Sequence, residues 1–107
     1  MKLKYIKDTL IKYLSGSRFL PEEVLTASEY FRHFNAINFD IKKDDGLFIA
    51  TSTNFQWGTI ATSGHSVREL DRNIKDAILT AFSVPSTYAD KLKIHNVDER
   101  QKKYALA

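Results

Sequence analysis

The sequence predicts an α+β fold in which an N-terminal helical segment precedes a β-β-β-α-β unit, with an antiparallel sheet packed on one amphipathic helix. Three observations support this prediction. The spacing of apolar residues is helical over residues 1–33, it alternates over residues 37–42, and a strong helix-start signal lies at Ser66. A chain of 107 residues that is 43% hydrophobic can bury one core but leaves little room for a second.

Residues 1–33 are expected to form a helical extension of two helices. In the first, from Lys2 to Leu14, apolar residues recur at spacings of three and four, and Gly16 follows where a C-cap glycine belongs. The second helix is expected to start at Pro21, whose fixed φ suits the first helical position. Its apolar face consists of Val24, Ala27, Phe31 and Phe34.

Residues 34–97 are expected to form the α+β domain, which begins with two strands. Apolar and polar residues alternate over 37–42, as in a strand with one buried face, and a second strand is expected over 47–53. The turn between them is Asp44-Asp45-Gly46, because aspartate and glycine tolerate positive φ. A third strand is expected around Thr59–Thr62.

The register of this hairpin has two alternatives. A loop with an even number of residues places Phe48 and Ala50 beside Ile41 and Phe39. A three-residue loop with a bulge at Gly46 instead places Leu47 and Ile49 there. Both alternatives keep the strands antiparallel.

A helix is expected to start at Ser66, because Ser66 and Glu69 have the spacing of a capping box. In that motif the Ser66 hydroxyl accepts from the Glu69 N–H, and the Glu69 carboxylate accepts from the Ser66 N–H. The apolar face of the helix consists of Val67, Leu70, Ile74, Ala77, Ile78, Ala81 and Phe82. A short fourth strand is expected around Leu92 and Ile94, and residues 98–107 are expected to be a polar tail, frayed or disordered.

Positive charge is concentrated at the two ends of the chain. Residues 1–18 carry a net charge of +4, residues 19–90 carry −4 and residues 91–107 carry +3. If the ends meet, they make a positive surface that suits nucleic acid or an acidic protein. The alternative is that the lysines only favour solubility. The candidate nucleic-acid-binding residues are Lys2, Lys4, Lys7, Lys12, Lys91 and Lys93.

The sequence carries no pattern typical of catalysis, of a metal site or of a cofactor site. Cysteine is absent, the three histidines are far apart, and no glycine-rich phosphate loop or Gly-x-Ser-x-Gly motif occurs. Asp40, Asp44 and Asp45 approach an acidic cluster, but a hairpin turn accounts for them. We therefore expect no enzyme, no bound metal and no cofactor.

A cytoplasmic location is expected. The longest wholly apolar run, Leu47–Ala50, is far shorter than the roughly 20 residues that span a bilayer. The N-terminus also lacks the apolar region of a secretory signal. We expect no association with a membrane.

The loop before Gly58 holds the candidate partner-binding residues, which are Asn54, Phe55 and Trp57. Aromatic side chains in loops often anchor protein interfaces or stack on bases. The alternative is that these residues cover the open end of a small core.

Residues 34–97 resemble the HicB-like antitoxin domain. The resemblance rests on the Asp45-Gly46 turn, on Phe48-Ile49-Ala50 in the second strand, and on the stretch 64–70 (Gly-His-Ser-Val-Arg-Glu-Leu) that opens the helix. It implies a partial RNase-H-like sheet that carries a helix. It also implies a protein that neutralises a small RNA-cleaving HicA-type toxin by covering its active site; solitary members are described as RNA-binding.

Two features depart from that family. Residues 53–58 (Thr-Asn-Phe-Gln-Trp-Gly) replace the Pro-Asp-x-Pro-Gly segment that usually follows the second strand, and the DNA-binding segment typical of antitoxins does not follow Val97. We therefore expect a non-catalytic protein that binds a protein partner, with RNA binding as the alternative and no DNA binding by that route. Small domains with exposed sheet edges frequently pair, so a homodimer is expected.

Overall fold

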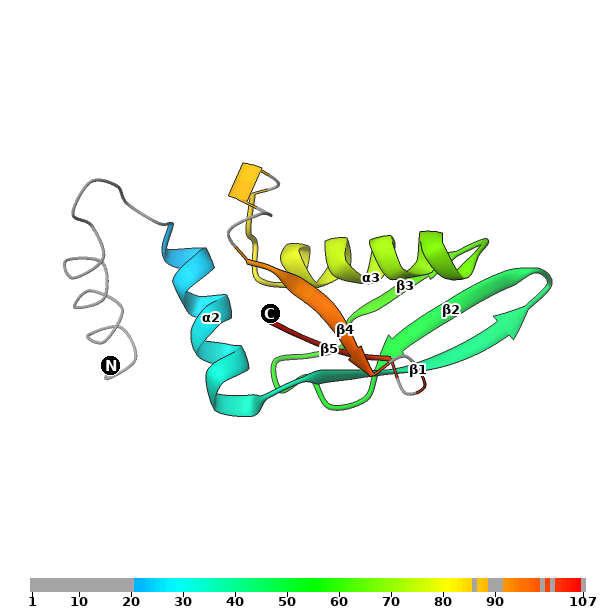
Figure 1. The fold of residues 1–107 in the computed structure, drawn as a ribbon, viewed down its shortest axis with the longest axis horizontal. Coiled ribbons are helices and arrows are strands. Elements are labelled where there is room, and N and C mark those ends of the chain that lie inside the picture. Colours follow the sequence, from blue (N-terminus) through cyan, green and yellow to red (C-terminus); the bar gives the residue numbers. More distant parts are fainter. Residues whose placement is uncertain (1–20, 86, 89–91, 99, 101, 107) are drawn as a thin grey trace.

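The computed structural model describes residues 21–85, 87–88, 92–98, 100 and 102–106, which form one antiparallel sheet and two α-helices (Figure 1). The sheet has five strands in the order β3-β2-β1-β5-β4. The α+β class and the antiparallel sheet are therefore confirmed. The predicted first helix, from Lys2 to Leu14, lies outside the described residues.

Strands β1 (Ile37–Asp44) and β2 (Leu47–Ser52) form the predicted hairpin. Asp44 pairs with Leu47, so the loop holds only Asp45 and Gly46. Both residues have positive φ, 53° and 79°, as a type I′ turn requires. The even loop is thus the alternative that occurs.

The even loop puts the two apolar rows of the hairpin on one face of the sheet. Ala50 pairs with Ile41 and Phe48 pairs with Lys43. Phe48 was predicted beside Ile41, so its partner on β1 is two residues away from the predicted one, but Phe48 keeps the expected face of the sheet. This face carries the fully buried Ala50 and the buried Phe39.

Strand β3 (Ala61–Gly64) begins two residues later than predicted. Ile60 is buried, but its backbone N–H donates to the Ser52 hydroxyl and its carbonyl accepts from the Ser52 N–H, just before β3 begins. Ile60 is therefore a buried residue that directly precedes the strand and is not part of it.

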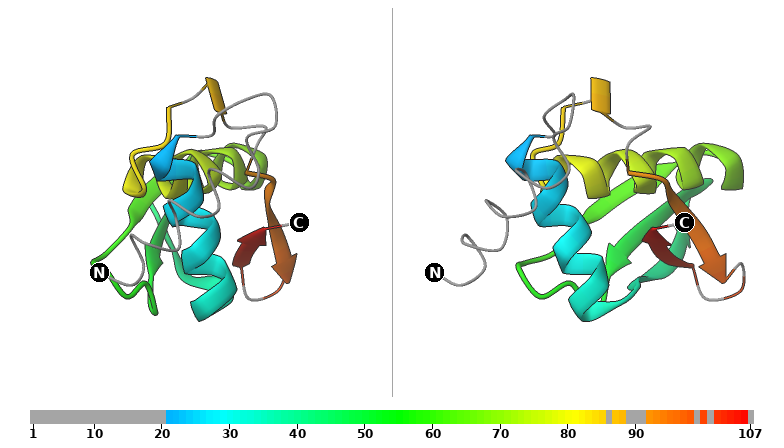
Figure 2. Two further views of the ribbon diagram at one scale, coloured as in Figure 1. Left: turned by 90° about the vertical axis from the view of Figure 1, so that its left-hand side faces the viewer. Right: turned by 60° about the vertical axis from the view of Figure 1, so that its left-hand side comes forward.

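Helix α3 (Val67–Ala81) starts at the predicted cap and lies along one face of the sheet (Figures 1 and 2). The Ser66 Oγ accepts from the Glu69 N–H at 3.1 Å. The Glu69 carboxylate, however, accepts at 2.7 Å from the N–H of His65 and not from that of Ser66. This hydrogen bond is the main reason why the pKa of Glu69 lies below its ordinary value.

The predicted apolar face of α3 is correct at its centre and wrong at Val67 and Ala81. Leu70, Ile74 and Ile78 are buried, whereas Val67 is 54% exposed and Ala81 is also exposed. Val67 lines an open groove between α3 and the edge of the sheet, so no strand covers it at this end of the helix.

The C-terminal residues correct two predictions. Strand β4 (Ile94–Asp98) starts after Leu92, which is buried in the turn before it. Residues 98–107 were predicted as a polar tail, but they contain strand β5 (Lys103–Leu106), which pairs with β1 on one side and with β4 on the other. Tyr104 in β5 is fully buried, so this short strand is held in the sheet by an aromatic side chain in the core.

Helix α2 (Glu22–Phe34) stands across one end of the sheet and of α3 (Figure 2). Pro21 is the N-cap residue, so the helix begins one residue later than predicted. Val24, Ala27 and Phe31 are buried, as predicted. The prediction missed Tyr30, which is 2% exposed. The described part of the N-terminal extension therefore belongs to the same core as the sheet and α3.

Candidate partner-binding site

A cluster of aromatic rings fills the end of the core where α2, α3 and the β2–β3 loop meet. Tyr30 is its centre, with ring centroids 5.1 Å from Phe55, 4.9 Å from Trp57 and 5.3 Å from Phe82. Tyr30 also lies 4.7 Å from Phe34 on the next turn of α2. Such edge-to-face and tilted pairs stabilise beyond the area that they bury.

The β2–β3 loop is held in place by hydrogen bonds to the start of β1 and to α2. Asn54 Oδ1 accepts from the Asn38 N–H at 2.7 Å, and Asn54 Nδ2 donates to the Ala36 carbonyl at 3.1 Å. The Gln56 N–H donates to the Tyr30 hydroxyl at 2.8 Å. The loop is therefore tied to the start of β1 and to α2.

The three predicted partner-binding residues have three different environments. Asn54 is half-buried and uses its side-chain amide within the chain. Phe55 is half-buried against the core, as the alternative interpretation expected. Trp57 packs edge-to-face with Tyr30 and with Phe82 but leaves 51% of its surface exposed.

A pocket of about 280 Å³ opens beside Trp57. Its lining residues come from one side of α2 and from the loop, namely Glu29, Tyr30, His33, Phe34 and Trp57. Of these five lining residues, the sequence predicted only Trp57 as part of a contact surface. The spacing of 29, 30, 33 and 34 indicates one face of a helix, but nothing in the sequence places that face beside the loop.

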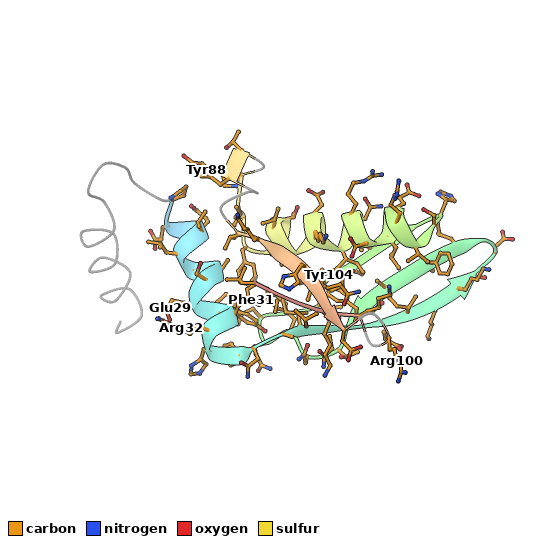
Figure 3. The ribbon with its side chains drawn as sticks, in the orientation of Figure 1. Glu29, Phe31, Arg32, Tyr88, Arg100 and Tyr104 are labelled. Atoms are coloured by element: carbon orange, nitrogen blue, oxygen red, sulfur yellow. The ribbon has the colours of Figure 1, made fainter. Side chains whose placement is uncertain are left out.

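Glu29 is the acidic residue that lines this pocket. Its side chain is 13% exposed and forms an ion pair with Arg32, whose side chain is 67% exposed. Figure 3 shows Glu29 and Arg32 on the same side of α2, with Phe31 directed the other way. The pocket thus combines aromatic walls with a mostly buried carboxylate.

A second groove, of about 580 Å³, lies between α3 and the β4–β5 end of the sheet. Arg68, Lys75 and Lys102 line it together with Asp71 and His95. The Asp71 carboxylate is engaged by Lys75 at 3.0 Å and by the Tyr104 hydroxyl at 2.6 Å. The lining of this groove is therefore mainly basic.

Most of the predicted nucleic-acid-binding residues lie outside the described residues, namely Lys2, Lys4, Lys7, Lys12 and Lys91. Lys93 is described and is exposed. The groove cations Arg68 and Lys75 were missed because α3 was interpreted only by its apolar face.

Within the described ranges, no three His, Asp or Glu side chains come together in a way that could hold a metal ion. Asp40, Asp44 and Asp45 are exposed on the β1–β2 hairpin. In the same part of the chain, no helix is both long and apolar enough to cross a membrane.

The resemblance to HicB-like antitoxins rests on the residues of the chain itself and stays a prediction. Comparisons with protein-family models, with curated proteins and with solved structures find no match for this chain.

Proposed function

We propose that this chain is a non-catalytic, HicB-like binding protein that holds a protein partner at the pocket beside Trp57. The observation that carries the proposal is the half-exposed indole of Trp57, fixed on a buried aromatic cluster next to an open pocket. Tryptophan is enriched among the residues that dominate binding energy at protein interfaces.

Rigidity supports this assignment. The loop that carries Trp57 is fixed by the hydrogen bonds of Asn54 and by the bond from Gln56 to Tyr30. A surface that is already ordered loses little conformational entropy when a partner binds. The indole is therefore presented in a conformation that suits binding without rearrangement.

The partner class follows from the resemblance, which implies a small RNA-cleaving toxin. The test is to express this chain with a ribonuclease encoded beside it and to measure both capture of the ribonuclease and protection of RNA. Trp57→Ala should weaken capture about 30-fold, the effect of about 2 kcal/mol at an interface hot spot.

Val67→Ala is the matched control for this test, because Val67 is as exposed as Trp57 but lies on α3, away from the loop. It should leave capture unchanged. Equal losses in the two variants, or a ribonuclease that the wild-type chain neither binds nor inhibits, would contradict the proposal.

RNA binding is the second candidate, and the basic groove beside α3 favours it. Arg68, Lys75 and Lys102 line this groove, and phosphate contacts of this kind give an affinity that falls steeply with salt. Binding of single-stranded RNA at low and moderate salt tests it. Arg68→Ala should weaken that binding if the groove is used, and salt-insensitive binding would rule it out.

A further inference from the structure

We propose that the pocket beside Trp57 is an aromatic cage that receives a positively charged side chain, lysine or arginine, from the protein partner. This inference rests on the proposed function and names the chemistry of the group that the site recognises. The cage is defined by Tyr30, Phe34 and Trp57 as walls and by Glu29 as the acidic group.

The walls of the cage are aromatic rings set at different angles. The ring of Trp57 is inclined at 75° to that of Tyr30, and the ring of Phe34 is inclined at 44° to it. Both neighbours lie within 5 Å of Tyr30, centroid to centroid. Aromatic faces attract cations that come within about 6 Å, and tryptophan does so most strongly.

Glu29 supplies the charge complementarity that an apolar pocket lacks. Glu29 lines the same pocket, and its side chain is only 13% exposed, so water screens its carboxylate poorly. A guanidinium of this chain, that of Arg32, already pairs with it. Because a carboxylate has two oxygens and about four acceptor positions, it can hold a second cation as well.

The size and the polarity of the pocket favour one cationic side chain over other occupants. Its volume of about 280 Å³ is just below the range of about 300–1,000 Å³ in which drug-sized ligands bind. A leucine or norleucine side chain would cover the Glu29 carboxylate without offering it a hydrogen bond, which is unfavourable. A lysine or arginine satisfies the carboxylate and the ring faces together.

Trp57 is the single tryptophan of the chain, so intrinsic fluorescence reports directly on the cage. The full-length chain should be titrated with N-acetyl-lysine amide, N-acetyl-arginine amide and tetramethylammonium chloride, at constant ionic strength. N-acetyl-norleucine amide and N-acetyl-citrulline amide are the neutral controls of matched shape. We expect saturable fluorescence changes with the cations in the millimolar range and none with the neutral probes.

Two glutamates of α2 provide a matched pair of variants. Glu29→Gln should weaken binding of the cationic probes at least five-fold, whereas Glu23→Gln, at an exposed position in the first turn, should leave it unchanged. Circular dichroism checks that both variants keep the fold. The inference is overturned if neutral probes bind equally well, if Glu29→Gln has no effect, or if no cation gives a saturable change.

The lysines of the N-terminal segment are the competing occupants. If replacing Lys2, Lys4, Lys7 and Lys12 with alanine raises the affinity for the free probes at least ten-fold, the chain itself fills the cage. That outcome overturns the assignment to a partner. Unchanged probe affinity supports it.

The capture experiment separates failure of the cage from failure of the proposed function. Loss of ribonuclease capture in Trp57→Ala, with full capture in Glu29→Gln, keeps the proposed function and overturns the cage. Saturable binding of cationic probes by a chain that captures no ribonuclease supports the cage chemistry and overturns the toxin assignment. Loss of capture in both variants supports both.

Discussion

The hydroxyl of Tyr104 donates a hydrogen bond of 2.6 Å to Oδ1 of Asp71, which joins the middle of the sheet to the helix that covers it. Figure 3 shows Tyr104 in this position, between the sheet and α3. Lys75 also reaches the Asp71 carboxylate, at 3.0 Å. The contact connects β5, which the sequence did not predict, to α3, which it predicted well.

Removal of this hydrogen bond should lower stability. Tyr104→Phe keeps the buried ring but leaves Asp71 without the hydroxyl, so we expect the free energy of unfolding to fall by about 1 kcal/mol. Urea denaturation of Tyr104→Phe, Asp71→Ala and the double variant measures the coupling between the two residues. Additive losses would show that the hydrogen bond contributes nothing.

Stability should fall in acid through Asp71. Partial burial raises the pKa of Asp71. Hydrogen bonds from Tyr104 and Lys75, together with the charges of Lys75 and Lys102, lower it by more than burial raises it. The pKa of Asp71 therefore lies below its ordinary value. The unfolded chain then binds the proton more tightly than the folded chain does. The contribution of Asp71 is complete above about pH 4 and is lost as the pH falls through the lowered pKa.

Asp71→Asn should flatten the acid side of the stability profile. Urea denaturation at a series of pH values from about 2 to 6 measures this slope. The control is Asp76→Asn, at an exposed position on the same helix. If both variants keep the slope of the wild-type chain, Asp71 is not the group responsible.

Gly64→Ala should be strongly destabilising. A Cβ at position 64 would lie 2.6 Å from the backbone nitrogen of Leu70 and 2.8 Å from its Cα, so β3 and α3 would have to move apart. We expect a loss of about 3 kcal/mol or more, as for other forced separations of packed backbone. A shift in the urea midpoint measures it.

Gly46→Asn is the matched control for Gly64→Ala. A Cβ at position 46 meets nothing within 4 Å, and asparagine accepts the positive φ of that turn. Gly46→Asn should lower the free energy of unfolding by about 1 kcal/mol or less. Equal effects at the two glycines would disprove the close approach of α3 to β3.

Residues 98–107 should be essential to the fold. Tyr104→Ala removes a fully buried ring and should cost about 3–5 kcal/mol, whereas Lys103→Ala, next to it, should cost less than about 1 kcal/mol. A chain that ends at Val97 should lose the cooperative unfolding transition, because β4 would have no neighbour in the sheet. Wild-type stability in that chain would contradict the placement of β5.

Local signals explain the elements that sequence analysis predicted correctly. The start of α3 follows from Ser66 and Glu69, which are three residues apart, and its buried face follows from the helical spacing of Leu70, Ile74 and Ile78. The face of the β1–β2 hairpin follows from the two-residue turn at Asp45 and Gly46. Each of these signals depends on residues that are neighbours along the chain.

The pocket required the tertiary structure. Tyr30 and Trp57 are far apart in the sequence, and no pattern within α2 or the loop indicates that their rings lie 4.9 Å apart. No sequence pattern indicates the role of Asn54 either. Its side-chain amide forms hydrogen bonds with Ala36 and with Asn38 at the start of β1, and these fix the loop within the chain. The sequence indicated that the loop aromatics matter, but not which of them stays exposed.

The sequence by itself determined the α+β class, the hairpin, and the start and central buried face of α3, because propensity, turn chemistry and capping act over a few residues. Only the tertiary structure decided that residues 103–106 form β5 and that Glu29 lies beside Trp57. The physical reason is that a strand in the middle of a sheet is stabilised by backbone hydrogen bonds to neighbours distant in sequence. A single buried residue such as Tyr104 leaves almost no pattern in the chain to reveal it.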